Sequence, residues 1–439
     1  MSAVPHNSKE KQAMETQKKI KRPELLLPAK DLEVLRTAVR YGADAVYIGG
    51  EAYGLRAKAR NFSPAEMAEG IRYAHEHGVK VFVTANILAH NGDLSGAEQY
   101  FGELAQMKPD AVLVADPGMF VLARKRCPDV PVHISTQANN TNYGTFNFWF
   151  AQGAERVVCA RELGLKEIAE IRKNIPEDRE IEAFVHGAMC ISYSGRCLLS
   201  NYFTGRDANR GACTHPCRWK YAVMEESRPG VYLPVEENER GTFVFNSRDL
   251  CMIDHIPDLL AAGVDSFKIE GRMKTALYVA SVGRAYRQAI DDYMKDEALY
   301  RERIPQYMDA IRKCTYRRFT TGFYYGRPDA EAMVYDSNTY VNEAVFLGIV
   351  EEITPEGRAR IMQRNKFYVG DRIEIMKPDG RDIPVIVRRM YNEEGVSVQS
   401  APHPRQIVDL ELAAEDSPDT AVAAEPGDIL RAVTGVEPD

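Results

Sequence analysis

The sequence predicts a (β/α)8 TIM-type barrel followed by a small all-β barrel. Eight short apolar runs alternate with amphipathic stretches between residues 24 and 271, as in a chain of βα units. Most of these runs are continuously apolar, which is typical of parallel strands buried on both faces. From residue 335 onward, short alternating runs are separated by turn signals. A doubly wound open sheet is the alternative for the first region, but no glycine-rich dinucleotide-binding motif follows its first strand.

The barrel elements follow one another in order along the chain. The first helix begins at the N-cap Asp31 and ends at Gly42, and the second begins with Ser63 and Pro64. Further helices are expected over 249–263, leading to the last strand, and over 276–294, closing the barrel. The eight predicted strands cover residues 24–29, 44–50, 80–86, 111–116, 132–137, 156–162, 181–187 and 266–271.

The pattern breaks between the seventh and eighth strands. Residues 188–242 form an insertion that carries a cysteine cluster and then two runs, 220–226 and 231–238, expected to form a hairpin. Because the insertion follows a barrel strand directly, it is expected at the C-terminal face, where active sites of such barrels are built.

We divide the chain into three parts. Residues 1–21 are polar and expected to be disordered, residues 22–334 form the barrel domain, and residues 335–439 form the β-barrel domain. Strands of the second domain are expected over residues 343–353, 358–365, 371–380, 382–390 and 395–400, with a turn at Pro378-Asp379-Gly380.

Composition limits the class of protein. The net charge of −7 over 439 residues argues against a surface coated in positive charge but permits a local basic groove. No secretory signal and no run of about 18 apolar residues is visible, so we expect a cytoplasmic protein without membrane contact. In a reducing compartment, clustered cysteines bind metal or catalyse more often than they form disulfides.

The cysteine cluster is the main chemical signal. A disulfide, a metal or iron–sulfur site and a catalytic thiol are all open, with the disulfide least favoured. Thiolates without paired histidines suit zinc or iron–sulfur clusters, although His215 lies inside the cluster. A fifth cysteine, Cys251, opens the predicted helix that follows. The four clustered cysteines span 28 residues and are Cys190, Cys197, Cys213 and Cys217.

Residues 182–200, EAFVHGAMCISYSGRCLLS, resemble the signature of the collagenase-like peptidase family U32. The blocks NRGACTHPCRWKY, NSRDLC and FKIEGRMK are also similar to family blocks, and the resemblance covers residues 22–330. It implies more than one activity. Branches of the family are implicated in hydroxylations that do not use O2. One branch hydroxylates the wobble uridine of tRNA, with prephenate as the apparent oxygen source. Another hydroxylates a cytidine of ribosomal RNA, and a third acts in ubiquinone synthesis. The length and C-terminal domain here look most like the tRNA branch.

The resemblance also implies a 4Fe–4S cofactor and its ligands. It places three ligands on Cys190, Cys197 and Cys213. The fourth is Cys217, which is close in sequence, or Cys251, which matches a ubiquinone-pathway relative. Four protein ligands, or three with an open iron, are what such a cluster requires.

Two other functions stay open at this point. His186 and Cys190 could form a Cys–His dyad, so a cytosolic peptidase is possible, but a catalytic thiol needs one cysteine and not five. No HExxH zinc motif is present in the sequence. The third possibility is an RNA-binding accessory subunit that only presents substrate.

Polar residues at the ends of the predicted strands are the site candidates, because these ends face the mouth of a barrel. Glu162 also lies at a strand end, and Glu182, inside a strand, is expected to be a structural partner of a cation. Lys268 and Glu270 alternate with apolar residues, so both point to one side, the barrel interior. We predict catalytic roles for His133, Arg161, His186 and Glu270, and substrate contacts for Asn86, Gln137, Lys268 and Arg272.

Basic and aromatic residues suggest a path for RNA. Basic side chains contact phosphates, and aromatic rings stack on splayed bases. The stretch 312–319, RKCTYRRF, adds Arg317 and Arg318 as predicted substrate contacts. The expected partner is therefore tRNA, and the sequence identifies no protein partner. The basic residues of the insertion are Arg206, Arg210, Arg218 and Lys220, interleaved with Tyr193, Tyr202, Phe203 and Trp219.

Overall fold

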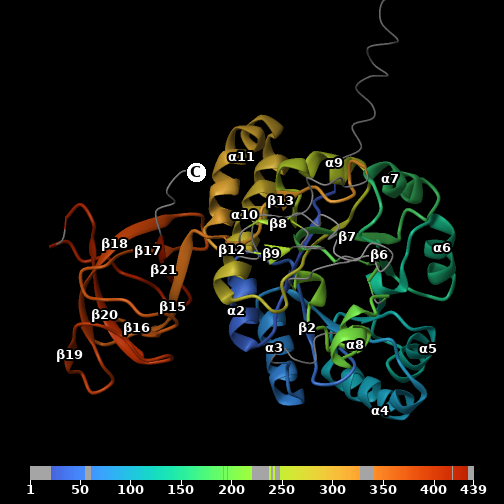
Figure 1. Ribbon diagram of the computed structural model, residues 1–439, viewed down its shortest axis with the longest axis horizontal. Helices are drawn as coiled ribbons and strands as arrows, with labels where there is room; N and C mark the ends of the chain where they lie inside the picture. Colours follow the sequence, from blue (N-terminus) through green and yellow to red (C-terminus); the bar gives the residue numbers. More distant parts are fainter. Residues whose placement is uncertain are drawn as a thin grey trace, which may run out of the picture.

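The computed structural model describes most of the chain. The described residues are 21–54, 61–190, 192–194, 196–219, 237–238, 241–242, 248–326, 341–417 and 419–433. The predicted N-terminal tail, apart from Lys21, and most of the predicted hairpin in the insertion lie outside these ranges. Figure 1 shows a barrel surrounded by helices, with the C-terminal β-barrel packed to one side of it.

Eight parallel strands close into the first barrel, which confirms the predicted fold class. Neighbouring strands pair in chain order, and the last strand, β11, pairs with both β7 and β1. Each of the predicted strands is present, shorter at its ends by a few residues in most cases. The strands are β1 (Glu24–Pro28), β2 (Ala45–Gly49), β3 (Lys80–Thr84), β4 (Ala111–Val114), β5 (Val132–Ile134), β6 (Arg156–Val158), β7 (Glu180–Ala188) and β11 (Ser266–Ile269).

Helices surround the barrel and begin where the capping residues place them. Asp31 accepts a hydrogen bond from the backbone of Val34, and Ser63 forms a capping box with Glu66. The helices of this layer are α2 (Leu32–Arg40), α3 (Pro64–Glu76), α4 (Asn91–Met107), α5 (Pro117–Arg126), α6 (Tyr143–Ala151), α7 (Leu165–Lys173), α9 (Ile256–Ala261), α10 (Ala276–Lys295) and α11 (Glu297–Arg312).

The helix predicted over 249–263 is wrong at its start. Residues Asp249–Cys251 form strand β10, which runs antiparallel to the end of β7, and α9 begins only at Ile256 after a short 3-10 turn. Short apolar runs do not distinguish strand from helix by periodicity. Residues 249–251 form a strand because they pair with the extended end of β7. Cys251 therefore lies on a strand at the edge of the barrel.

A register shift marks the end of β7. Lys268 pairs with Phe184, but the next residue, Ile269, pairs with His186. Gly187 follows with φ of +107°, and a Cβ there would lie 2.5 Å from the carbonyl oxygen of Glu270. Only glycine permits this close approach, so this position fixes how β7 leaves the barrel and enters the cysteine-bearing insertion.

A closed antiparallel barrel follows, which confirms the predicted second fold. The strand order is β17-β21-β15-β16-β20-β18, and β17 also pairs with β18. The short β19 (Ser397–Val398) pairs with β18. The strands are β15 (Ala344–Ile353), β16 (Ala359–Met362), β17 (Arg372–Met376), β18 (Asp382–Tyr391), β20 (Ile407–Ala414) and β21 (Ile429–Val433).

The two barrels are packed against each other. The hydroxyl of Tyr41, the C-cap residue of α2, donates to the carbonyl of Met376 at 2.8 Å, and Arg284 on α10 pairs with Asp382 at 2.8 Å. Met376 and Ile429 belong to the same apolar core as the first barrel. The second barrel is therefore fixed to the side of the first. None of the helices in the described ranges is long and apolar enough to cross a membrane.

Candidate active site

A small cavity lies inside the barrel at the carboxyl ends of its strands. Its volume is 60 Å³. Apolar walls come from residues such as Tyr47 and Phe184, and the rest of the lining is polar. Six of the predicted site residues line this one cavity, although they come from strands and loops across the whole barrel: Asn86, Gln137, Arg161, Lys268, Glu270 and Arg272.

Lys268 is a buried cation of this cavity. Its Nζ donates to Glu182 at 2.6 Å and lies over the rings of Tyr47 and Phe184, at 4.5 and 5.4 Å from their centroids. Glu182 also accepts from Arg156 at 3.1 Å. The prediction that Glu182 is a partner of a cationic side chain is confirmed. Its carboxylate fixes the position of the Lys268 ammonium group.

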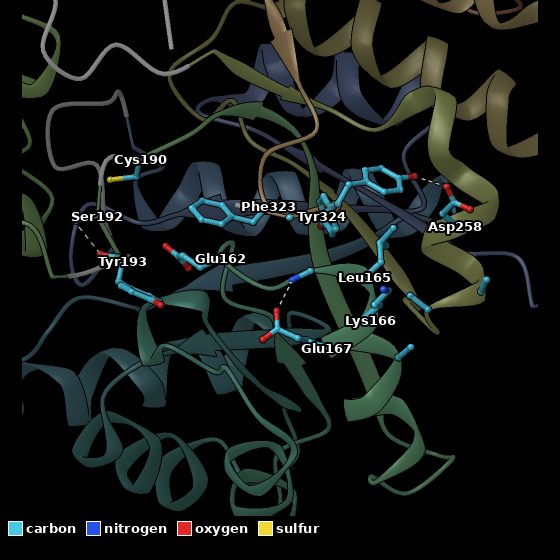
Figure 2. A pocket seen from close by; sticks show the side chains of 16 residues that line it. Glu162, Leu165, Lys166, Glu167, Cys190, Ser192, Tyr193, Asp258, Phe323 and Tyr324 are labelled. Carbon is cyan, nitrogen blue, oxygen red and sulfur yellow. Dashed lines mark hydrogen bonds between the residues drawn. The ribbon is translucent and has the colours of Figure 1, made fainter. Parts of the chain in front are cut away.

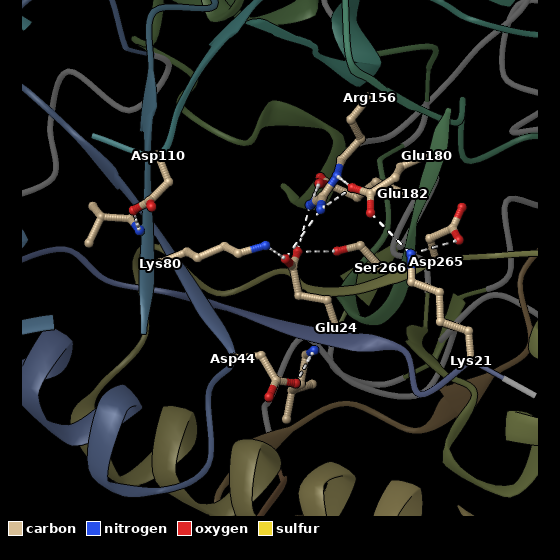
Figure 3. Close-up of polar contacts among 12 residues, drawn as sticks. Lys21, Glu24, Asp44, Lys80, Asp110, Arg156, Glu180, Glu182, Asp265 and Ser266 are labelled. Carbon is tan, nitrogen blue, oxygen red and sulfur yellow. Dashed lines mark hydrogen bonds and ion pairs between the residues drawn. The ribbon is translucent and has the colours of Figure 1, made fainter. Parts of the chain in front are cut away.

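A charge network closes the opposite end of the barrel. Arg156 binds Glu24, Glu180 and Glu182, as Figure 3 shows. Burial by itself would raise the pKa of Glu24, but the charge and hydrogen bonds of Arg156, together with Lys80 and Ser266, outweigh burial and lower that pKa. The network lies at the amino ends of the strands, the end associated with stability in such barrels.

Arg272 is held on the cavity wall by two hydrogen bonds. Its guanidinium donates to Thr84 Oγ1 at 3.0 Å and to Asn61 Oδ1 at 2.9 Å. A Cβ on Gly49 would lie 2.2 Å from the guanidinium, so a larger residue at the end of β2 would displace it from this position. The remaining polar wall is an amide layer in which Asn86 donates to Gln137 at 3.0 Å.

Arg161 connects the cavity to the cysteine-bearing insertion. Its guanidinium donates to the carbonyl of Ala188 at 2.9 Å and to Ser194 Oγ at 3.1 Å, and it lies 4.8 Å from the centroid of the Phe184 ring. Asn139 donates to the carbonyl of Ser194 at 3.2 Å. Sequence reasoning missed Asn139 and Ser194; the only signal was the run of amides in STQANNTN. These contacts fix the loop that carries Cys190.

The two predicted catalytic histidines lie elsewhere. His133 is buried edge-on to Phe82, and burial, with the charge of Arg156, lowers its pKa well below the ordinary value. His186 is buried against Tyr278, Tyr286 and Phe319, and burial lowers its pKa to about 4. Both rings are neutral at pH 7, and neither lines the cavity. This placement gives no support to the predicted catalytic roles.

The cysteines of the insertion differ from the other candidate, Cys251. Cys190 is exposed and Cys197, Cys213 and Cys217 are half-buried, whereas Cys251 is buried. Burial raises the pKa of the Cys251 thiol to about 12. None of the eight cysteines, all of which lie in the described ranges, forms a disulfide.

The insertion brings candidate ligands of the implied cluster near one another. Two segments of the insertion are joined by Ser200, whose Oγ accepts from the backbone of Thr214 at 3.0 Å, so the regions of Cys197 and Cys213 lie close to each other. In the described ranges, no three His, Cys, Asp or Glu side chains are arranged to hold a metal ion. Cysteine thiols are the ligand type that an iron–sulfur cluster requires. In the described ranges, however, these side chains are not yet arranged to coordinate one.

A much larger groove lies beside the cavity. Its volume is 1030 Å³, and it runs between α7, α9 and residues 323–326, with Cys190 and Tyr193 of the insertion at one end (Figure 2). Glu162, a predicted strand-end candidate, lines this groove and is half-buried. Burial raises the pKa of Glu162.

The residues of the predicted RNA path differ in their exposure. Tyr202 is 82% exposed, and its ring lies 5.1 Å from that of Phe203, which is itself 6.3 Å from the Trp219 ring. Arg206 and Arg318 are exposed. Arg210 is instead paired with Asp93 on α4 at 2.9 Å. The side chains of Arg218 and Lys220 lie outside the described part of the chain.

Arg317 requires a correction. It was predicted to contact substrate, but its side chain is buried and binds Asp249 through the guanidinium at 2.6 Å. The backbone of Arg317 donates to the same carboxylate at 3.1 Å. Because both partners are occupied inside the protein, Arg317 fixes β10 to the segment after α11 and is not presented to RNA.

Comparison with known proteins agrees with this architecture. The chain belongs to Peptidase family U32: the family profile matches residues 30–334, and that of the Peptidase family U32 C-terminal domain matches residues 342–431. It is similar to "tRNA hydroxylation protein P1" of Bacillus subtilis (strain 168), with 40% identity over 394 residues, 89% of this chain and 92% of the relative.

Two further relatives have related names. "tRNA hydroxylation protein P" of Escherichia coli (strain K12) is 37% identical over 424 residues, covering 87% of this chain and 92% of the relative. The 23S rRNA 5-hydroxycytidine synthase of the same organism is 35% identical over 324 residues, covering 73% of this chain and 48% of the relative.

Proposed function

We propose that this protein is a tRNA-modifying enzyme that hydroxylates the wobble uridine to 5-hydroxyuridine without O2. The observation that carries the proposal is the similarity to tRNA hydroxylation proteins over nearly the full length of both chains, at 40 and 37% identity. A polar cavity and a cysteine-bearing loop at the same barrel mouth are consistent with it.

We also propose an iron–sulfur cofactor. Cys190, Cys197 and Cys213 would hold a 4Fe–4S cluster, with Cys217 or Cys251 as the fourth ligand. When bound, such a cluster supplies electron transfer at the barrel mouth. Protein purified without air should then be brown and contain about four iron atoms and four sulfides per chain. Colourless protein with stoichiometric zinc would contradict this cofactor.

Serine variants separate the two candidates for the fourth ligand. Cys217→Ser should reduce iron content if the insertion alone supplies the ligands. Cys251→Ser should do so if the buried thiol on β10 is recruited. Cys127→Ser is the control, since Cys127 is buried in the core of the barrel domain and donates to the carbonyl of Ala123.

Prephenate is the proposed oxygen-donating co-substrate. Replacing the C5–H of uridine by C5–OH requires an oxygen atom and the removal of two electrons, so a co-substrate must take part. Lys268 and Arg272 line the cavity as buried cations and would bind a carboxylate there. Asn86 and Gln137 would orient it through their amides.

The peptidase alternative has less support. A Cys–His dyad requires the imidazole within hydrogen-bond reach of the thiol. His186 is instead enclosed by Tyr278, Tyr286 and Phe319, with the Tyr286 hydroxyl 3.5 Å from Nδ1, while Cys190 is exposed at the groove. The geometry therefore does not favour a dyad of these two residues.

Nucleoside analysis of a strain that lacks this protein tests the proposal. Loss of 5-hydroxyuridine derivatives from tRNA is the expected result. Loss of 5-hydroxycytidine from ribosomal RNA would instead assign the activity of the rRNA relative. If purified protein binds tRNA but modifies it only when other proteins are added, it is an accessory subunit. An unchanged nucleoside profile with lost peptide cleavage would favour the peptidase.

A further inference from the structure

The cavity and the groove differ in the size of ligand that they can hold. Ligand sites in proteins have volumes of about 300–1,000 Å³. The cavity inside the barrel has 60 Å³, whereas the groove beside α7 has 1030 Å³. The cavity is therefore too small for a nucleotide, and the groove has room for one.

The end of the groove next to the insertion has the surfaces that a base needs. Tyr193 is 48% exposed and Phe323 is half-buried, and both line the groove together with Cys190. Figure 2 shows these side chains at the same end of the groove as Glu162. Unstacked bases bind to proteins by stacking on such rings and by hydrogen bonds to their edges.

Charge selects the part of RNA that can enter. Of the described residues, those with charged side chains that line the groove are the acidic Glu162, Glu167 and Asp258 and one cation, Lys166. This excess of carboxylates repels phosphate, so the backbone stays outside while a neutral base enters. The exposed cations Arg196 and Arg206 lie on the insertion, outside the groove lining, where phosphates can be bound.

The three carboxylates differ in their hydrogen-bond partners. Glu167 accepts a hydrogen bond from the backbone of Gly164 at 2.8 Å, and Asp258 accepts from the hydroxyl of Tyr325. The Glu162 carboxylate accepts from the backbone of Arg161 and of Glu162 itself, and no side chain among the residues that the structure describes donates to it. Because a carboxylate has about four acceptor positions, Glu162 can still accept a hydrogen bond from a ligand.

We propose that this groove is the binding site for the target base, extruded from the RNA, with Tyr193 stacking on the base and Glu162 accepting a hydrogen bond from its N–H edge. The proposal rests on the proposed function and adds the site at which the pyrimidine is recognised. It separates two sites: the groove holds the base, and the small cavity inside the barrel remains for a carboxylate group of the co-substrate.

RNA binding with and without the base tests this site. The probe is a fluorescent anticodon stem-loop, compared with the same RNA carrying an abasic position at the target uridine. Wild-type protein should bind the intact loop about tenfold more tightly, the order of one stacking contact. Glu162→Gln and Tyr193→Ala should each remove most of this difference while affinity for the abasic RNA stays unchanged.

Matched controls keep the result interpretable. Glu170→Gln changes an exposed carboxylate of α7 outside the groove lining, and Tyr143→Ala changes an exposed tyrosine at the start of α6. Both should retain the tenfold difference. If Glu162→Gln and Tyr193→Ala also retain it, the groove is not the base site, although the proposed function stands. If wild-type protein does not distinguish the two RNAs, the site is overturned as well, and the nucleoside profile then decides the function separately.

Discussion

The guanidinium of Arg161 donates to Ser194 Oγ at 3.1 Å and, through its other amino group, to the carbonyl of Ala188 at 2.9 Å. One side chain of the cavity wall therefore holds the chain on both sides of Cys190. The cavity inside the barrel and the cysteine-bearing loop are joined by this residue, which acts by positioning the loop and need not transfer a proton.

Arg161→Ala should loosen the loop. We expect faster hydrogen exchange at residues 188–194 in protein without cofactor, and lower iron content after anaerobic reconstitution. Arg161→Lys should show nearly the same hydrogen exchange and iron content as Arg161→Ala, because an ammonium group cannot donate to two acceptors in the planar geometry of the guanidinium. Arg196→Ala, which removes an exposed arginine from the same insertion, is the control and should leave both measurements unchanged. Wild-type exchange rates in Arg161→Ala would refute the positioning role.

Glu182→Gln should destabilise the fold strongly. The change leaves the buried cations Lys268 and Arg156 without the carboxylate that lies between them. Breaking a buried ion pair by removing one partner costs about 3–5 kcal/mol, which urea unfolding would measure. Glu98→Gln, at the surface beside Arg126, should change stability little. Equal effects of the two substitutions would show that the network inside the barrel is not a major source of stability.

The buried His186 should make the fold sensitive to acid. Burial lowers its folded-state pKa from 6.5 to about 4, so the unfolded chain binds the proton more readily between these values. The contribution of His186 to the free energy of unfolding is therefore fully present above the unfolded-state pKa, and it is lost as the pH falls towards the folded-state pKa. The expected loss between pH 7 and pH 5 is about 2 kcal/mol from this group.

Urea unfolding at the two pH values measures this loss. His186→Gln should reduce the pH dependence by about that amount, whereas His77→Gln, at an exposed histidine, should not. His133, whose pKa is lowered by burial as well, contributes in the same direction in every variant. An unchanged pH dependence in His186→Gln would contradict the burial of a neutral imidazole.

Arg317 and Arg318 should behave differently despite being neighbours. Arg318→Ala removes an exposed cation, so tRNA affinity should fall and the slope of log affinity against log salt should decrease by about one. Arg317→Ala breaks the buried pair with Asp249 and should cost about 3–5 kcal/mol of stability while leaving the salt slope unchanged. If the salt slope decreases in Arg317→Ala and not in Arg318→Ala, then Arg317 contacts the RNA and Arg318 does not.

Much of the cavity could be predicted because barrel geometry is simple. Polar residues at strand ends converge on one mouth, so Asn86, Gln137 and Arg272 could be placed together without knowledge of any contact. The alternation of Lys268 and Glu270 with apolar residues predicted their shared direction, and both line the cavity.

The failures have long-range causes. The ion pair of Arg317 joins it to Asp249, 68 residues away, so local sequence shows only a basic stretch. His186 lies on the same strand as the cavity residue Phe184, two residues further on, but the register shift of β7 against β11 falls between them, and the His186 ring packs against α10. Asn139 and Ser194 matter only through a contact between two loops 55 residues apart.

The central claim is that this protein hydroxylates tRNA through its cysteine-bearing barrel mouth. The most direct measurement is the amount of 5-hydroxyuridine in tRNA from a strain that lacks the protein, grown without oxygen and complemented with wild-type protein, Cys197→Ser or Cys127→Ser. Wild-type and Cys127→Ser should restore the nucleoside, and Cys197→Ser should not. Full 5-hydroxyuridine in the uncomplemented strain, or complete restoration by Cys197→Ser, would contradict the account.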